Sequence, residues 1–391
     1  MQIGERKIGV NHPPYVIAEI GVNHDGEVAR ALELTDAAAD AGADAVKLQF
    51  FETDRLMSKA AKLAAYQKNA GETDPIEMLK RLELAIDEMA LIVDRAHERG
   101  IHAIVTVFST ELVETAETLA WDAYKTASPD IVNWPLLEAL MATGKPMIVS
   151  TGASELDEVV RAVGWLADAK DRLAVLQCVS SYPAPETASG GILAIADATG
   201  LPTGFSDHQL ATRHANIPVA AGACILEKHV TDDRTRKGPD HQASILVGQL
   251  PKYIQSARRG VQGRAWVTYL KDQNSETIEV AAAKRWAREV EFPEAEDRFL
   301  GWQVAQIESM KEVLDCERDV REVARQSVVS MKAIPVGTVI TREMLTIKRP
   351  GTGILAYEID TVVGRIATRA IEADVPIVQE DLECLSSSKK S

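Results

Sequence analysis

Residues 203–229 read TGFSDHQLATRHANIPVAAGACILEKH. Two short apolar runs at the ends of this stretch, 203–207 and 223–229, flank an alanine-rich segment with helical tendency. A strand–helix–strand order predicts two consecutive parallel strands, whose carboxyl ends lie on one face of a barrel. His208 and His229 close the two runs, so both imidazoles could point at one bound divalent metal.

The same strand–helix unit recurs along residues 15–250. Each short β-branched run is followed by a loop and by a segment with helical apolar spacing. Eight such units specify a (β/α)8 barrel more simply than an open, doubly wound sheet. The lead before the first run, 2–14, is expected to form a hairpin that caps the barrel floor. The strand-forming runs are Tyr15–Ile20, Ala43–Phe50, His102–Phe108, Ala123–Lys125, Pro146–Ser150, Leu173–Cys178, Thr203–Asp207 and Ala223–His229.

Polar side chains gather at the ends of these runs, where a barrel carries its active site. Lysines stand at the ends of two separate runs, Lys47 and Lys125. An ammonium that points into a barrel needs an anionic partner. Together with the neighbouring serines and threonines, the two lysines would suit a phosphate and a carboxylate. The other polar residues at strand ends are Glu19, Asn23, His24, Gln49, Thr106, Ser128, Ser150, Thr151, Ser180, Tyr182, Ser206 and Glu227.

The composition narrows the class of the protein and its partners. The chain has 391 residues, 46% hydrophobic and 26% charged, which suits a large barrel plus a smaller module. A formal net charge of −15 argues against nucleic acid or an anionic membrane as the main partner. No leader pattern or membrane-spanning run is present, so a cytoplasmic location is expected. The cysteines lack CxxC spacing and are expected to be free thiols: Cys178, Cys224, Cys316 and Cys384.

The pattern changes after the barrel, which is expected to occupy residues 1–260. Residues 261–325 are charged with helical tendency and are interpreted as an insert or linker. Short β-like runs with frequent turns over 326–385 predict a small separate domain, close to the minimum size that holds a core. The polar end, 386–391, is expected to be disordered.

Several short motifs occur in one order along the chain. They are AEIGVNHDG (18–26), VKLQ (46–49), YK (124–125), STG (150–152), SYP (181–183), FSDH (205–208), EKH (227–229), GPD (238–240) and KRPGTG (348–353). With these motifs the chain closely resembles the sialic acid synthase family, which makes N-acetylneuraminate and related nonulosonic acids. The resemblance covers residues 2–250 and 326–382.

The resemblance implies a reaction, a cofactor and a partner. The reaction is an aldol-like condensation of phosphoenolpyruvate with the open-chain aldehyde of an N-acetylated amino sugar, typically N-acetylmannosamine. A divalent ion, Mn²⁺ or Mg²⁺, would be held by His208 and His229 and would act as a Lewis acid on the aldehyde oxygen. The C-terminal domain is expected to resemble type III antifreeze proteins and to be exchanged between the two subunits of a homodimer.

The resemblance also implies roles for individual residues. Lys47 and Lys125 would contact phosphoenolpyruvate. Glu19 could also assist proton transfer to the incipient alkoxide. Arg349 would enter from the partner's C-terminal domain and contact the N-acetyl group. Hydroxyl or amide donors to phosphoenolpyruvate would be Thr106, Ser128, Ser150, Ser180 and Ser206, and the sugar hydroxyls would be held by Glu19, Gln49, Asp130, Tyr182 and Asp240.

Some positions depart from the family pattern and leave alternatives open. Residues 126–130 read TASPD, where Pro129 restricts the turn, so the sugar could be N-acetylmannosamine or the diacetamido sugar that leads to legionaminate. The long 261–325 segment leaves domain exchange open. One rival is a synthase acting on a phosphorylated sugar, which lacks a 348–353 module and needs further cationic contacts. The other is a non-catalytic carbohydrate-binding barrel. Such a barrel would have no use for a metal-binding pair that faces two lysines.

Overall fold

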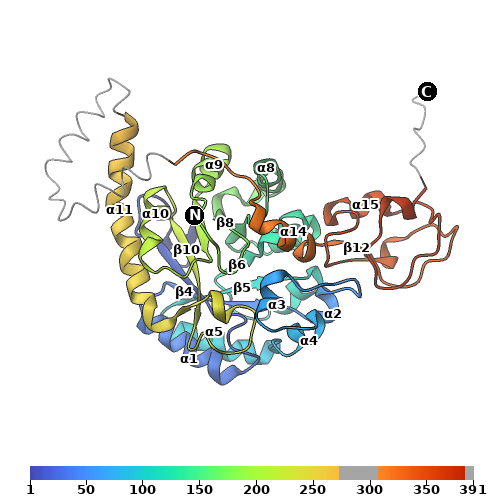
Figure 1. Cartoon of the computed structure of the whole chain (residues 1–391), viewed down its shortest axis with the longest axis horizontal. Helices are drawn as coiled ribbons and strands as arrows, with labels where there is room; N and C mark the ends of the chain where they lie inside the picture. Colours follow the sequence, from blue (N-terminus) through green and yellow to red (C-terminus); the bar gives the residue numbers. More distant parts are fainter. Residues whose placement is uncertain (273–306, 384–391) are drawn as a thin grey trace.

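The computed structural model describes residues 1–272 and 307–383 (Figure 1). The middle of the predicted 261–325 segment, the polar end 386–391 and Cys384 lie outside the described residues. Cys178, Cys224 and Cys316 are free thiols, as expected. Among the described residues, no helix is both long and apolar enough to cross a membrane.

The centre of the molecule is a closed barrel of parallel strands. Strand β10 pairs with β9 on one side and with β3 on the other, which closes the sheet on itself. All eight expected runs form these strands, with small shifts at their ends, so the predicted barrel is confirmed. The strands are β3 (Tyr15–Glu19), β4 (Ala45–Phe50), β5 (His102–Val107), β6 (Ala123–Thr126), β7 (Met147–Ser150), β8 (Leu173–Cys178), β9 (Thr203–Asp207) and β10 (Ile225–Thr231).

Helices follow the strands and cover the outside of the barrel (Figure 1). In the first of them, buried Ala31, Leu34, Thr35 and Ala38 recur at the spacing of one helical face and pack on the sheet. The loop after β4 carries three further short helices. The outer helices are α1 (Val28–Asp40), α5 (Ile86–Glu98), α6 (Val113–Ala116), α7 (Trp134–Ala142), α8 (Leu156–Trp165), α9 (Gly190–Thr199), α10 (Asn216–Ala220) and α11 (Leu250–Asp272), and the loop helices are α2 (Thr53–Leu56), α3 (Ala65–Asn69) and α4 (Pro75–Lys80).

The expected hairpin closes the amino-terminal end of the barrel. Strands β1 (Gln2–Ile3) and β2 (Arg6–Lys7) pair antiparallel. Ile3 and Ile8 pack against the inward apolar side chains of the lower barrel, such as Ile148. Because this end is filled with apolar side chains, ligands can enter the barrel only from the carboxyl ends of the strands.

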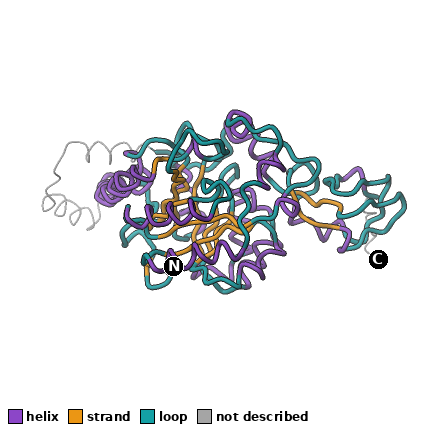
Figure 2. Tube along the Cα trace, turned by 90° about the horizontal axis from the view of Figure 1, so that it is seen from below, coloured by secondary structure: helices purple, strands orange, loops and turns teal. Residues whose placement is uncertain are grey.

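The C-terminal domain is small and lies to one side of the barrel (Figure 2). It has its own hydrophobic core. Strands β12 (Ser327–Ser330) and β13 (Leu345–Lys348) pair antiparallel, and single bridges such as Ile334 with Ile371 replace longer ladders. The core contains Val328, Ile340, Leu345, Ile354, Val362 and Ile377.

A linker joins the domain to the carboxyl face of the barrel. It includes α14 (Arg318–Ala324), which lies between the barrel and the domain in Figure 1. The predicted barrel boundary at residue 260 falls inside α11. The domain itself meets the barrel where Met57 bridges to Arg349.

Candidate active site

The barrel register brings polar side chains from different strands to one level. Side chains two residues apart on a strand share a face, so Lys47 and Gln49 point the same way, as do Glu227 and His229. Glu19 of β3 is in register with both Lys47 and His229. On the neighbouring strands Thr106 lies opposite Gln49 and Lys125.

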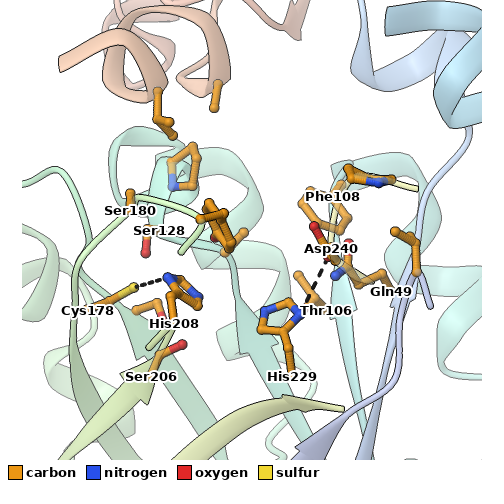
Figure 3. A pocket seen from close by; sticks show the side chains of 18 of the residues that line it. Gln49, Thr106, Phe108, Ser128, Cys178, Ser180, Ser206, His208, His229 and Asp240 are labelled. Carbon is orange, nitrogen blue, oxygen red and sulfur yellow. Dashed lines mark hydrogen bonds and ion pairs between the residues drawn. The ribbon is translucent and has the colours of Figure 1, made fainter. Parts of the chain in front are cut away.

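A cavity opens above this level at the carboxyl end of the barrel (Figure 3). Two predicted site residues do not line it: Glu19 lies beneath Lys47, and Asp130 is fully buried beside the cavity. The other predicted residues all line it: Lys47, Gln49, Thr106, Lys125, Ser128, Ser150, Ser180, Tyr182, Ser206, His208, His229, Asp240 and Arg349.

Four buried charges form an ionic network at the bottom of the cavity. The Lys47 ammonium contacts the Glu19 carboxylate and lies 3.2 Å from Glu227 Oε1, and it donates a 3.0 Å hydrogen bond to Thr106 Oγ1. Lys125 Nζ lies 3.2 Å from Glu227 Oε2. The cavity therefore presents two ammonium groups whose charges are balanced inside the protein until an anion arrives.

The two carboxylates of this network differ in their affinity for a proton. Burial, with help from Glu227, raises the pKa of Glu19 to about 7, although Lys47 opposes the shift. Burial also acts to raise the pKa of Glu227, but the ammonium groups of Lys125 and Lys47 outweigh it and hold this pKa far below its usual range. Near neutral pH Glu227 stays ionised, whereas Glu19 can gain or lose a proton.

Serine hydroxyls converge on one wall, and we call Ser128, Ser150 and Ser180 the serine cluster. Ser128 Oγ accepts a 2.9 Å hydrogen bond from the Gly152 amide. A side chain at Gly152 would collide with the hydroxyls of Ser180 and Ser128, so only glycine allows them to approach. Ser150 Oγ is buried without a hydrogen-bond partner among the described residues. The cluster therefore offers hydroxyl donors to a ligand, and that of Ser128 is already held in place by the Gly152 amide.

Aromatic rings line the upper part of the cavity. The Tyr182 ring lies 4.1 Å from the His208 ring and 4.6 Å from the Tyr66 ring, measured between centroids. Tyr66 comes from α3, in the loop after β4. The Arg349 guanidinium reaches the cavity from the C-terminal domain and lies 5.5 Å from the Phe108 ring centroid. Loops and the C-terminal domain thus build the upper end of the cavity, and the barrel strands build its lower end.

Comparison with known proteins identifies the family. The model of the NeuB family matches residues 34–264, more than half of the chain. The chain belongs to the NeuB family. A SAF-domain model matches residues 325–383, which confirms the predicted C-terminal domain of the antifreeze-like (SAF) type. This membership also confirms the predicted enzyme class, a phosphoenolpyruvate-dependent transferase that forms a carbon–carbon bond.

Individual relatives resemble this NeuB-family chain over nearly its whole length. N,N'-diacetyllegionaminic acid synthase of Legionella pneumophila is 32% identical, over 94% of each chain. N-acetylneuraminate-9-phosphate synthase of Mus musculus is 29% identical, over 98% of this chain and 96% of the other. The crystal structure of the spore coat polysaccharide biosynthesis protein SpsE of Bacillus subtilis superimposes with a TM-score of 0.75, at 26% identity and 99% coverage of both chains.

NeuB-family synthases are metal-dependent, and the two histidines fit such a role. The centroids of the His208 and His229 rings lie 5.3 Å apart. His208 Nδ1 lies 2.7 Å from the Val179 carbonyl oxygen, which fixes the tautomer that leaves Nε2 free to bind a metal. Burial lowers the pKa of His229 well below its usual value, so this ring is neutral, as a ligand must be. Its Nδ1 has no hydrogen bond among the described residues and lies 3.5 Å from Asp240 Oδ2.

The protein would supply only part of a coordination shell. The described residues contain no group of three or more His, Cys, Asp or Glu side chains placed to hold a metal ion. Two imidazoles leave open positions that water and substrate oxygens can fill, which suits a catalytic ion. His208 is also 3.7 Å from Cys178 Sγ. Burial acts to lower the pKa of His208, but this sulfur and the Val179 carbonyl raise it to about 8, so binding of a metal to the ring would release a proton near neutral pH.

Arg349 lines the cavity of the barrel in its own chain. Its entry from a partner subunit is the prediction made above, and a single chain does not test it. The Arg349 amide donates to the Leu56 carbonyl, and the Ser58 hydroxyl donates to the Arg349 carbonyl, at 2.9 and 2.8 Å. Domain exchange in a dimer stays a prediction.

Sequence reasoning did not assign a role to several residues of the site. Glu227 precedes His229 by two positions on a strand, and this alternation was the signal that both side chains face the barrel interior. Phe108 follows Thr106 by two positions at the end of a predicted strand run and carried the same signal. Tyr66 carried none, because it lies in the loop after β4, whose side chains are placed by tertiary packing and not by a repeat.

Proposed function

We propose that this NeuB-family enzyme condenses phosphoenolpyruvate with the open-chain aldehyde of an unphosphorylated, N-acetylated amino sugar and releases phosphate. The observation that carries the proposal is the pairing, within one cavity, of two buried lysines with a serine cluster and two facing histidines. Lysines and preset hydroxyls suit the phosphate and carboxylate of phosphoenolpyruvate. The histidines suit a divalent ion beside the second substrate.

The chemistry assigns the residues their tasks. C3 of phosphoenolpyruvate forms a bond to the aldehyde carbon, water adds at C2, and the bond between C2 and the phosphate oxygen breaks. Lys47 and Lys125 would hold phosphoenolpyruvate, with Thr106, Ser206 and the serine cluster as donors. Glu19, whose pKa lies near neutral, would assist proton transfer to the new alkoxide; its Oε1 accepts a 3.2 Å hydrogen bond from Gln49, which lines the cavity. A bound Mn²⁺ or Mg²⁺ would polarise the aldehyde oxygen.

The cations of the cavity favour an unphosphorylated sugar. Apart from Lys47 and Lys125, Arg349 is the only Lys or Arg among the described residues that line the cavity. Lys62 borders a smaller adjoining hollow. The phosphate of a phosphorylated sugar would need its own cluster of cations or amides, like the one proposed for the phosphate of phosphoenolpyruvate. One arginine is better matched to the carbonyl oxygen of an N-acetyl group.

The apolar wall bears on the choice between the two sugars. Val22, Leu56, Met78 and Leu79 line the cavity beside Tyr66. Such a wall can cover the methyl groups of acetamido substituents better than it can pair free hydroxyls. We therefore favour the diacetamido sugar over N-acetylmannosamine. The name of the Legionella pneumophila relative, N,N'-diacetyllegionaminic acid synthase, supports the same choice.

A homodimer with exchanged C-terminal domains is a second part of the proposal. In an exchanged dimer Arg349 completes the site of the partner barrel, whereas without exchange it completes the site of its own barrel. Mixing a His208→Ala chain with an Arg349→Ala chain distinguishes them, because activity recovers in the mixed dimer only if Arg349 acts between subunits. If the mixed protein has the molar mass of a dimer but its activity does not recover, each subunit completes its own site.

Phosphate release provides the direct test of the reaction. The purified enzyme, with Mn²⁺ or Mg²⁺ and phosphoenolpyruvate, would be assayed with N-acetylmannosamine, its 6-phosphate, and the diacetamido sugar. We expect release with unphosphorylated sugars, fastest with the diacetamido sugar, and loss of activity on chelation that is restored by added metal. Absence of release with every unphosphorylated aldose, or a clear preference for the 6-phosphate, would contradict the proposal.

A further inference from the structure

The linker between the barrel and the C-terminal domain carries a buried carboxylate. Residues 315–317 form a short 3₁₀ turn that rests on the carboxyl face of the barrel just before α14. Glu317 in this turn is only 1% exposed. An acid so deeply buried needs donors that compensate for its lost hydration, and these donors come from two loops of the barrel.

One carboxylate oxygen of Glu317 bridges the loops that follow β7 and β8. Glu317 Oε1 accepts from the Ala153 amide at 2.7 Å and from the Ser180 amide at 2.6 Å. Oε2 accepts from the Leu314 amide at 3.0 Å, which fixes the carboxylate within its own turn. Ala153 has a positive φ of 51°, a conformation that aims its amide but is costly for a residue with a Cβ atom.

These two loops act on two members of the serine cluster: Ser180 lies in the loop after β8, and Gly152 in the loop after β7 donates its amide to Ser128, which follows β6. Ser180 donates its amide to Glu317 while its hydroxyl lines the cavity. Gly152, the neighbour of Ala153, packs between the hydroxyls of Ser180 and Ser128. The spacing between the loops therefore decides where the hydroxyls of Ser128 and Ser180 lie, and Glu317 is the side chain that joins the loops from behind.

Other contacts hold the same linker on the barrel without touching the serine cluster. Arg321 and Arg325 both pair with Glu158, at N–O distances of 2.7 and 2.6 Å. Asn133 donates to Gln326 Oε1 at 2.6 Å. These contacts account for the docking of the linker, so Glu317 is not needed for docking alone. Its two bonds to separate loops are what distinguish it.

We propose that Glu317 is a positioning residue for phosphoenolpyruvate, because its carboxylate sets the spacing of the loops after β7 and β8 and thereby places the hydroxyls of Ser180 and, through Gly152, of Ser128. The inference rests on the proposed function, in which these serines receive the phosphate. It also gives the linker two tasks, since the same segment that delivers Arg349 to the sugar end of the cavity organises the phosphate end.

Steady-state kinetics of variants at this position test the inference. Glu317→Ala leaves two buried amides without an acceptor, and we expect the KM for phosphoenolpyruvate to rise about ten- to a hundredfold, as for other small displacements of binding groups. The KM for the sugar should stay near its wild-type value. Glu317→Gln keeps an oxygen for both amides and should recover most of the affinity. The Glu317→Asp side chain is too short to reach both loops, so its KM for phosphoenolpyruvate should lie between those of the glutamine and alanine variants. This variant carries the test if the alanine variant is insoluble.

Gln326→Ala is the matched control. It removes the hydrogen bond with Asn133 from the same linker but leaves both bonds of Glu317 intact, so it should lower thermal stability without changing the KM for phosphoenolpyruvate. Calorimetric titration of phosphoenolpyruvate alone, with metal present, should repeat the ranking of the Glu317 variants. Equal rises in both KM values, or a glutamine variant as poor as alanine, would overturn the inference. Wild-type enzyme that releases no phosphate would instead overturn the proposed function.

Discussion

The two ends of the cavity are built in different ways. At the phosphate end, Lys47, Lys125 and Glu227 project from strands whose register is set by backbone pairing around a closed barrel. At the sugar end, Tyr66 comes from a loop helix and Arg349 from another domain. A closed sheet tolerates little movement, whereas loops can change length and sequence without disturbing it. The comparison suggests that the strands preserve the reaction and the loops select the sugar.

The strongest test of this division is removal of a lysine from the phosphate end. Lys125→Met takes away one of the two ammonium groups near Glu227, and we expect kcat/KM for phosphoenolpyruvate to fall about a thousandfold, as when one transition-state donor is lost. Loss of the partner also leaves a buried carboxylate undercompensated, at a cost of about 3 kcal/mol in the free energy of unfolding. Phosphate release and urea unfolding measure the two effects. Lys145→Met, on an outer ion pair with Glu117, is the control; a Lys125→Met enzyme with near-normal turnover would break the assignment.

Removal of the histidines should have the next largest effect. We expect His208→Ala and His229→Ala each to lose metal-dependent turnover by about a hundredfold or more while remaining folded, because each removes one of two protein ligands. Metal titration followed by phosphate release checks this expectation, with circular dichroism for the fold. His97→Ala, which alters a partly exposed ring paired with Asp122, should behave as wild type. Substantial metal-stimulated activity in either ligand variant would remove the metal assignment.

A change at the sugar end should act on the sugar alone. Arg349→Ala removes the guanidinium beside Phe108 and Asp130, and we expect the KM for the sugar to rise about tenfold, the worth of one hydrogen bond to a charged group. The KM for phosphoenolpyruvate should not change. Initial rates with each substrate varied in turn give both constants, and Arg342→Ala in the same domain is the control. An equal rise in both constants would show that the two ends are not separate.

The last prediction concerns the ion pairs of Glu158 with Arg321 and Arg325, which should affect stability and leave turnover unchanged. Burial opposes ionisation of Glu158, but Arg325 and Arg321 outweigh it and lower its pKa to about 2. The pKa of Glu158 is lower in the folded state than in the unfolded chain, where it is near 4.5. Its ion pairs therefore stabilise the fold fully above pH 4.5, and this stabilisation is lost as the pH falls towards 2. This difference corresponds to a contribution on the order of 3 kcal/mol. Urea unfolding of Glu158→Gln should therefore differ most from wild type at pH 7, and the difference should shrink below pH 4.5 and vanish as the pH falls towards 2.

Local sequence patterns account for the barrel and for the phosphate end. The alternation of apolar strands and amphipathic helices specifies the order of the elements, and parallel strands bring their carboxyl ends to one face. Lys47, Lys125, His208 and His229 could be assigned to one cavity for this reason alone. The period of two along β10 also places Glu227 beside them, although its ionic role depends on distances that no repeat contains.

Short-range periodicity and motifs a few residues long were enough to predict the barrel, the residues at the strand ends and the family. The path of the linker across the barrel face could not be predicted in this way. Glu317 meets Ala153 and Ser180 across more than a hundred residues of chain, and Arg349 meets the loop after β4 across nearly three hundred. Contacts of this kind arise from the packing of whole domains, and no local pattern of side chains specifies which distant loops a linker will join.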